Sequence, residues 1–272
     1  MLNKLLKTLF NITILLLCVN RTCGQTAPVT DGKIKQDEKS TGKPGWFKFG
    51  INYSSNNVFM GRTDSVATPY FIPEVKYTLK SGLFMSASAY YIPNKKTSKL
   101  DGGEITAGYD FDITDDLSGS GSYTKQFYSA TSTEVTSSIG STFNVEFDYD
   151  LSDICSPSVS FDYIINKQGI ENDFFAGFDI DHDFIKKGVF GEKDIVLFAP
   201  GVSINTGAQD GGKFELLNYE ISTPLIYKSG HFIFQLAPRY SIAKNLLPDA
   251  TGAKPSNKTS VFYFETGVFL KF

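Results

Sequence analysis

Residues that build metal, redox and catalytic centres are scarce in this 272-residue chain, which has 3 Cys, 2 His, 3 Met and 1 Trp. Two of the cysteines lie in the first 24 residues, so Cys155 alone remains beyond them and no internal disulfide can form there. The chain also contains no Gly-rich phosphate loop, no HExxH and no CxxC motif. We therefore expect no cofactor, no metal site and no enzymatic activity.

Long hydrophobic runs are equally scarce, and the mean hydropathy is −0.13. The clearest apolar run is Leu9–Val19, which follows two lysines and precedes small residues. A basic start and an apolar core of this length predict a secretory signal peptide over residues 1–24, because the run is too short to cross a bilayer as a helix. A lipid anchor at Cys18 or Cys23 is the weaker alternative, because no small-residue lipobox precedes either cysteine.

Positive charge is in deficit as well. The formal net charge is −3, and removal of residues 1–24 takes away three basic residues and no acidic one, which leaves −6. This balance gives no reason to expect a nucleic-acid partner. Residues 25–45 are polar and charged without periodicity, so we interpret them as a flexible periplasmic leader that precedes a single domain over residues 46–272.

From Trp46 onward, apolar and polar residues alternate with period two, which predicts β-strands and no helix of useful length. The outward apolar faces include Ile139 and Leu217. The twelve predicted strands span residues 46–57, 68–80, 82–93, 103–114, 116–128, 134–150, 156–167, 172–185, 193–206, 213–228, 230–243 and 259–272.

The connections between these strands also alternate. Tight turns follow the second, fourth, sixth and tenth strands, and generally longer, polar loops follow the odd-numbered ones; the link 186–193 is longer than this rule predicts. An even strand count with this loop pattern predicts an all-β, up-and-down antiparallel transmembrane barrel with both termini on the periplasmic side. A soluble β-sandwich is the alternative, but strands of this length with aromatic residues near their ends favour the barrel.

The last strand, KTSVFYFETGVFLKF, has one nearly continuous apolar face and ends on Phe272. It resembles the closing strand of bacterial outer-membrane barrels, in which a terminal Phe after alternating aromatic residues is the assembly signal. That resemblance implies that Phe272 is recognised by the barrel assembly machinery.

A second resemblance begins at NVFMGRTD, residues 57–64, and continues through Pro69 to SGLF at residues 81–84. This stretch is similar to a family of uncharacterised outer-membrane proteins whose first strand ends in an aromatic residue, a Gly and an Arg, although Met60 and the order of Gly61 and Arg62 depart from that pattern. More broadly, residues 46–272 resemble small porin-like barrels of Gram-negative bacteria. The resemblance implies location in the cell outer membrane, among lipids and lipopolysaccharide.

Lysines of the long loops are candidates for contact with lipopolysaccharide phosphates. They are Lys95, Lys96, Lys99, Lys167, Lys213, Lys244, Lys254 and Lys258.

The predicted inward faces carry many acids and few bases, and Arg239 and Glu265 lie on adjacent strands where they are able to pair. The candidate lumen and selectivity residues are Glu104, Asp110, Asp112, Glu146, Asp148, Asp162, Asp179, Asp181, Arg239 and Glu265. Between the strands that carry these acids, the fifth strand alternates Ser with Gly119 and Gly121. Side chains this small are expected to leave space in the lumen beside that strand.

These residues favour a narrow passive channel, or porin, for small solutes or cations. The alternative is a closed lumen filled by paired charges, in a barrel with a structural or surface-interaction role. A calcium site is a third, weaker possibility, because the acids alternate along strands and no turn gathers carbonyl oxygens. An outer-membrane phospholipase is disfavoured, because neither His182 nor His231 lies in the His-x-Ser-Asn-Gly string of that enzyme family.

Overall fold

The computed structural model describes residues 45–63, 67–93, 99–130, 132, 136–151, 154–167, 169–208, 212–245 and 260–272. The predicted signal peptide, nearly all of the leader and most of the 244–258 loop lie outside these ranges. Within them, no helix is long and apolar enough to cross a membrane.

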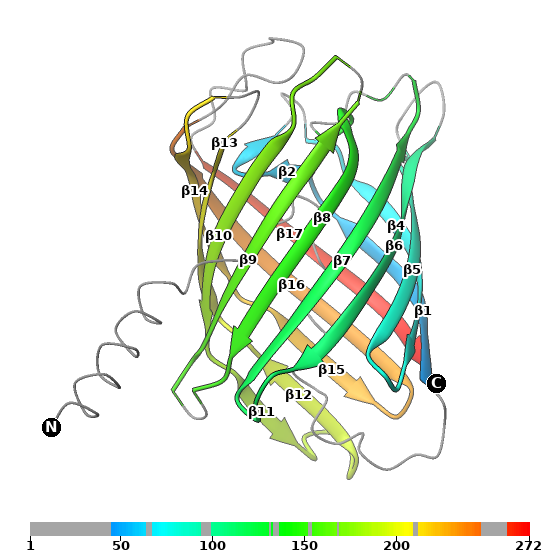
Figure 1. Cartoon of the computed structure of the whole chain (residues 1–272). Helices are drawn as coiled ribbons and strands as arrows, with labels where there is room; N and C mark the ends of the chain where they lie inside the picture. The colour runs from blue at the N-terminus through cyan, green and yellow to red at the C-terminus, as the bar shows by residue number, and fades with distance from the viewer. Residues whose placement is uncertain are drawn as a thin grey trace, which may run out of the picture.

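The described chain is built almost entirely of β-strands, arranged as a tilted cylinder (Figure 1). The strands are β1 (Gly45–Ser54), β2 (Val58–Phe59), β3 (Arg62–Thr63), β4 (Tyr70–Leu79), β5 (Leu83–Tyr91), β6 (Leu100–Asp112), β7 (Leu117–Tyr128), β8 (Ile139–Tyr149), β9 (Ser156–Asn166), β10 (Asp173–Asp181), β11 (Phe184–Lys187), β12 (Asp194–Phe198), β13 (Gly201–Ala208), β14 (Glu215–Ser222), β15 (Leu225–Ser229), β16 (Phe232–Ala243) and β17 (Ser260–Lys271).

Twelve antiparallel strands close the barrel, because three of them are interrupted. The segment pairs β10–β11, β12–β13 and β14–β15 each continue one strand, and β2 and β3 form a separate hairpin. Pro200 and Pro224 occupy two of the breaks, where a residue without an N–H group cannot donate to the ladder. Each strand otherwise pairs with its sequence neighbour, and β1 pairs with β17. The predicted closed, twelve-stranded, up-and-down barrel is confirmed.

The seam between β1 and β17 closes at the last residue. The N–H group of Phe47 donates to the carbonyl oxygen of Phe272 at 3.0 Å, and the N–H group of Phe272 donates back to the carbonyl oxygen of Phe47 at 2.9 Å. The Phe272 ring stacks on Phe49, with ring centroids 6.1 Å apart, and on His231 at 4.7 Å. The terminal Phe is therefore part of the closure of the barrel.

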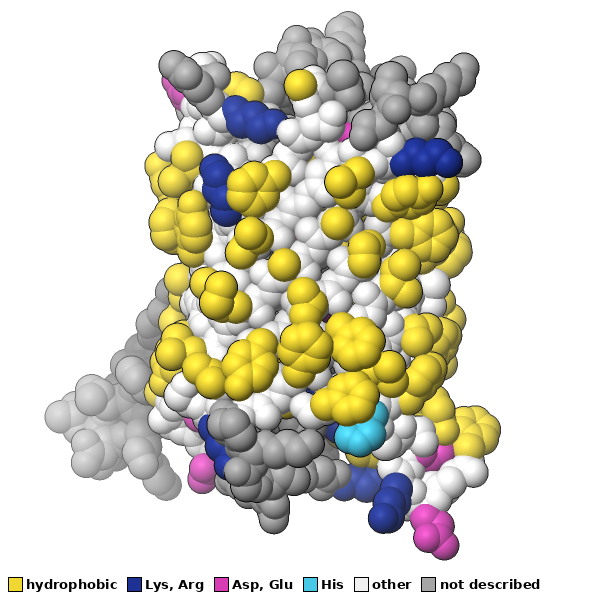
Figure 2. Space-filling view, turned by 90° about the vertical axis from the view of Figure 1, so that its right-hand side faces the viewer, with side chains coloured by type: hydrophobic (Ala, Val, Ile, Leu, Met, Phe, Trp, Pro, Cys, Tyr) yellow, Lys and Arg dark blue, Asp and Glu magenta, His cyan; other side chains and the backbone are white. Residues whose placement is uncertain are grey.

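The outer surface of the barrel is apolar along its whole circumference. Large hydrophobic side chains point outward on successive strands, including Phe49 at 41% exposure, Met85 at 61% and Phe127 at 51%. Figure 2 shows them gathered in an upper and a lower belt on the face in view. A water-soluble surface rarely exposes so much contiguous apolar area, whereas a lipid-facing band flanked by aromatic girdles requires it. The barrel is thus an outer-membrane protein that spans the bilayer.

One end of the barrel carries the tight turns and the carboxyl terminus, and the other carries the longer connections. Bacterial barrels place the short turns in the periplasm, so the longer connections face outward from the cell. The exception that the sequence analysis noted, the 186–193 link, is explained by β11, which pairs with β12 and extends the wall at the periplasmic end.

Asp194 orders the link between β11 and β12. Its carboxylate accepts hydrogen bonds from the backbone N–H groups of Val189 at 2.7 Å, Phe190 at 2.7 Å and Gly191 at 2.9 Å. Desolvation raises the pKa of Asp194, but the N–H groups of Phe190, Val189 and Gly191 outweigh it, so the pKa lies below its ordinary value. The loop is therefore held by an ionised carboxylate, and it presents Phe190 at 81% exposure.

Two residues expected on the lipid face point inward instead. Ile139 and Leu217 are buried in an apolar cluster within the barrel. A register shift separates Ile139 from Ser141 on β8, and the pairing of β13 with β14 passes from Asn218 to Leu216 without Leu217. Each shift is a β-bulge, which inserts one residue and reverses the inward–outward parity.

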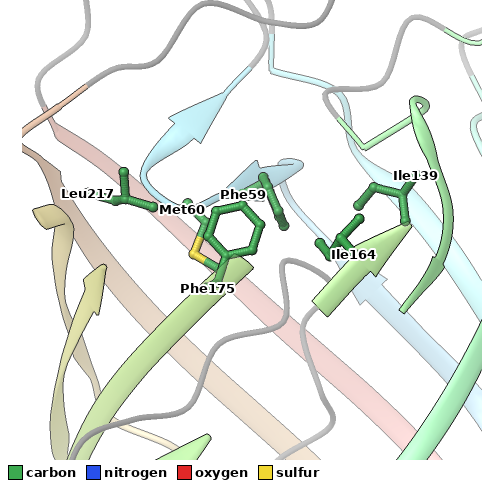
Figure 3. Packing of buried hydrophobic residues seen from close by; sticks show 6 residues of the cluster. All are labelled: Phe59, Met60, Ile139, Ile164, Phe175 and Leu217. Atoms are coloured by element: carbon green, nitrogen blue, oxygen red, sulfur yellow. The ribbon is translucent and has the colours of Figure 1, made fainter. Parts of the chain in front are cut away.

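The hairpin β2–β3 lies inside the barrel near its outer end, and we name residues 58–63 the inner hairpin (Figure 1). All six residues are buried, with Phe59 only 2% exposed. Phe59 and Met60 pack against Phe175, whose ring lies edge-on to Phe59 with the ring centroids 5.4 Å apart (Figure 3). The connection after the first strand, expected among the generally longer, polar loops, therefore departs from that expectation in residues 58–63.

The turn of the inner hairpin depends on Met60 and Gly61, which have positive φ angles of 50° and 78°. Gly61 is also confined, because an added Cβ would lie 2.8 Å from the Cβ of Asn218. Glycine adopts this backbone region without a steric penalty and leaves room for the barrel wall. The tight turn lets the chain fold back within the lumen.

Candidate functional site: the lumen

The inward side chains form cross-strand rows that alternate acids with serines. One row, here named the acid–serine row, follows the hydrogen-bonded partners across eight strands. Its members, from β6 to β16, are Asp112, Ser118, Asp148, Ser158, Asp179, Ser203, Glu220 and Ser241.

A second row lies beside it, one pleat nearer the outer end on β6. It begins Asp110, Ser120, Glu146, Ser160 and continues through Gly177 to the amides Asn205 and Asn218. In both rows the carboxylates occupy alternate strands, so neighbouring carboxylate positions lie two strands apart, or about 9.5 Å. This spacing limits the electrostatic repulsion between neighbouring carboxylates, and a serine hydroxyl lies on the strand between them.

The acid–serine row crosses the membrane as it winds around the barrel. Asp112 is the last residue of β6, next to a periplasmic turn, whereas Ser241 lies two residues before the outer end of β16. Tilted strands produce this rise, because a row perpendicular to them climbs along the barrel axis. The predicted acids Asp110, Asp148 and Asp179 thus belong to two continuous tracks.

Three further hydrogen bonds fix acids to neutral donors. Ser203 Oγ donates to Asp179 at 3.1 Å, Asn144 Nδ2 donates to Asp162 at 2.8 Å, and Ser88 Oγ donates to Glu104 at 3.3 Å. Asp162 has no exposed surface. Asp181 lies at the periplasmic end of β10, opposite Gly201 of β13. All of the predicted acids therefore lie on inward positions, but Asp162 is enclosed by its neighbours.

Arg239 lies between two carboxylates. Its Nε atom is 3.8 Å from Glu265, the partner expected from the sequence, and its Nη1 atom is 2.9 Å from Glu220. The hydroxyl of Tyr263 donates to the other oxygen of Glu220 at 2.8 Å. Sequence reasoning missed Glu220, although it shares the inward parity of Ser222 on the same strand and that parity was available to find it.

The same side of the lumen is filled by further polar contacts. Lys48 Nζ lies 3.2 Å from Glu74, and Gln235 Nε2 donates to Asn52 Oδ1 at 2.8 Å across β17. Gly267 makes this crossing possible, because an added Cβ would lie 2.1 Å from Asn52 Oδ1. Residues on β13, β14, β16, β17 and β1 thus interlock into a buried polar wall.

The opposite side, on β5 to β8, is more open. Its inward residues retain partial exposure and include Ser86, Ser88, Glu104, Asp110, Ser118, Ser120, Ser122, Glu146 and Asp148. The sequence analysis attributed this room to serines and glycines together. The glycines Gly119 and Gly121 in fact pair with outward-facing Phe111 and Tyr109, so they face the lipid and the serines alone line the lumen.

Aromatic and apolar residues close the outer end of the lumen. The inner hairpin covers β8, β9, β10 and β14 through the apolar cluster of Figure 3. On the other side, Tyr90 packs edge-on to Tyr70, with ring centroids 6.3 Å apart, and stacks on Tyr128 at 5.8 Å. In this conformation the more open β5–β8 side leads to a constricted outer mouth.

The two histidines lie near the periplasmic end, and His182 directly follows Asp181. His182 Nδ1 is 2.8 Å from the carbonyl oxygen of Ile154, and its ring packs on Phe184. His231 Nδ1 is 2.6 Å from the carbonyl oxygen of Lys271. Both are engaged in strand-end contacts. Across the residues that the structure describes, no three His, Cys, Asp or Glu side chains are grouped to hold a metal ion.

No protein family and no curated protein sequence matches the chain. Solved structures with a similar fold include a KdgM porin in complex with disordered oligogalacturonate, with 9% identity, a TM-score of 0.48 and coverage of 84% of this chain and 99% of that one. They also include a NanC porin, with 11% identity, a TM-score of 0.49 and coverage of 83% and 100%. LpxR from Salmonella typhimurium has 10% identity, a TM-score of 0.44 and coverage of 82% and 99%.

Proposed function

We propose that this protein is a narrow passive channel of the outer membrane that prefers cations and small polar solutes. The observation that carries the proposal is the pair of rows in which carboxylates alternate with serines from the periplasmic end toward the outer end of the lumen. A chain of carboxylates at intervals of about 9.5 Å offers successive weak sites, and conduction requires sites that an ion can both enter and leave.

The asymmetry of the lumen supports the same proposal. Arg239 and Lys48 lie on the filled side, each within 4 Å of a carboxylate, and Lys271 lies there over the Trp46 ring. Lys76 of β4 lies opposite Ser86, with its Nζ atom 4.2 Å from the ring centroid of Phe84, and the inward residues of β5 to β8 beyond it include serines and acids. Water entering the lumen would therefore run along β5 to β8, where the field is negative. A cation is attracted to this surface and an anion is repelled.

The test is planar-bilayer conductance of the purified, refolded protein in a salt gradient. If the protein is a cation-preferring channel, we expect steady conductance and a reversal potential whose sign shows that cations are more permeant than anions. Replacement of Asp110, Asp148 and Asp179 by Asn should reduce the conductance and its cation preference. The matched control replaces Asp115 and Asp116 by Asn, because these acids lie in a periplasmic turn outside the rows. Anion preference in the wild-type protein would contradict the role of the acids.

A second candidate function is a closed barrel with a structural or surface-interaction role, favoured by one observation. The inner hairpin and the stacked tyrosines occupy the outer mouth. A folded protein that migrates as a heat-modifiable band and yet conducts no ions, even when the inner hairpin is shortened, would support this role and exclude the channel. In either role we propose a non-enzymatic protein.

A further inference from the structure

A lysine on the lipid-facing wall of the barrel lies among aromatic residues near the outer membrane surface. Lys125 lies on β7, three residues before the outer end of that strand, and its side chain is exposed. It shares the outward face with Tyr123 and Phe127, at 39% and 51% exposure. An ammonium group on such a surface is stable only where it reaches water or an anionic headgroup.

The hydroxyl group of Ser141, which is itself hydrogen-bonded to Tyr123, holds this lysine against the barrel wall. Lys125 Nζ donates to Ser141 Oγ of β8 at 3.2 Å, and the hydroxyl of Tyr123 lies 3.0 Å from the same oxygen. Ser141 follows the β-bulge at Gly140, and the adjacent strand position on β9 is Ile165. The ammonium group is thus positioned at the surface instead of extending freely.

A second lysine approaches the outer end of the same strand. Lys167, which follows β9, is exposed, and its Nζ atom lies 5.5 Å from the ring centroid of Tyr128, the last residue of β7. Tyr128 follows Lys125 by three residues, or about 10 Å along the strand. Neither lysine forms an ion pair with a described carboxylate. Figure 2 likewise shows Lys and Arg side chains along the upper edge of the apolar surface.

We propose that Lys125 and Lys167 form a binding site for the phosphate groups of an outer-leaflet glycolipid, namely lipopolysaccharide. The aromatic residues Tyr123 and Phe127 contact its acyl chains below the headgroup, and the two ammonium groups bind its phosphates. Two cations separated by one strand suit a headgroup that carries more than one phosphate. Lys125 lies on the outer wall, and Lys167 lies at the rim, over Tyr128 of the stacked tyrosines at the outer mouth.

The experiment measures binding of the doubly phosphorylated lipid anchor of lipopolysaccharide to the refolded protein by native mass spectrometry. Lys125→Gln and Lys167→Gln should each weaken binding about fivefold, and the double variant about thirtyfold, because one lysine near an anionic surface contributes roughly a factor of five. The matched control is Lys80→Gln with Lys193→Gln, two exposed lysines at the periplasmic end. Heat-modifiable migration verifies that each variant is folded.

Two comparison ligands separate the possible sources of phosphate. The same anchor without its phosphates should bind the wild-type and double-variant proteins equally, and inorganic phosphate should not compete with the intact lipid. Unchanged lipid binding by the double variant would overturn the proposal. Displacement of the lipid by inorganic phosphate at a similar concentration would assign the lysines to free phosphate and overturn the lipid site.

Discussion

The inner hairpin offers a direct test of how the lumen is closed, through the substitution Phe59→Ala. Phe59 is 2% exposed, its ring meets Phe175 edge-on, and the Arg62 guanidinium lies 5.1 Å from its centroid. The hairpin itself pairs only Val58 with Thr63 and Phe59 with Arg62, so its own ladder adds little to its position. This ring and Met60 supply the apolar part of the docking, and Thr63 adds a hydrogen bond that its hydroxyl accepts from Asn56 Nδ2 at 2.9 Å.

Truncation of a buried Phe to Ala costs about 3 kcal/mol at the lower end of measured values. If that loss falls on the docked state alone, the ratio of docked to undocked hairpin decreases about 150-fold. In single-channel recordings we expect the ratio of open to closed time to be higher for the Phe59→Ala variant than for the wild-type protein, by up to about 150-fold. The twelve-stranded wall should stay intact, because Phe59 contributes to no strand of it.

The matched control is Phe127→Ala, which removes a ring that is 51% exposed on the outer face of β7. This variant should leave the open probability unchanged. Equal recordings for wild-type protein and the Phe59→Ala variant, with both folded, would refute the inference that the hairpin limits conduction.

Three further predictions concern the ends and the filled side of the barrel. Deletion of Phe272 should reduce the outer-membrane yield far more than a loop substitution does, because it removes two seam hydrogen bonds and the proposed assembly signal; equal yields would contradict this. Folding lowers the pKa of Asp194, so the ionised carboxylate stabilises the loop. This stabilisation should be complete above the ordinary carboxyl pKa and should disappear as the pH falls through the pKa of the folded protein. The protection factors of the loop amides, which are exchange rates corrected for the intrinsic pH dependence, should then fall in acid, while the Asp194→Asn variant shows low protection at every pH. Arg239→Met should destabilise the barrel by about 3 kcal/mol in thermal unfolding, because it leaves two buried carboxylates unpaired. Adding Glu220→Gln and Glu265→Gln should restore most of that loss, and no recovery would show that the charges are not coupled.

The strands and their order were predictable because each is a local, period-two pattern. The predicted span 156–167 compares with Ser156–Asn166 in the structure, and the predicted final strand 259–272 compares with Ser260–Lys271. Lipid outside and water inside impose opposite polarities on successive residues, so the sequence must record the alternation at nearly every position. The same parity placed the acids inward and indicated that Arg239 and Glu265 were able to meet.

The exceptions depend on information that is not local. A β-bulge adds one residue to a strand, and no residue type marks its position in the sequence. The inward direction of the Ile139 and Leu217 side chains was therefore not predictable from either strand alone. The inner hairpin is another case, since Val58–Thr63 fold inward only because Phe175, Ile139 and Leu217, more than 70 residues later, form the apolar surface that receives them. The acid–serine row was likewise not predictable, because its order depends on the register between neighbouring strands, and the sequence pattern of each strand does not determine that register.

The seam between β1 and β17 has a consequence for the timing of folding. It pairs Lys48 with Lys271, and its terminal hydrogen bonds join Phe47 to Phe272. Contacts so distant in sequence form slowly, because the ends of a long chain must be brought together first. The barrel therefore cannot close until β17 has been synthesised and exported, because β1 has its second neighbour only in that strand. Until then two strand edges and the lipid-facing surface stay open to aggregation in the periplasm.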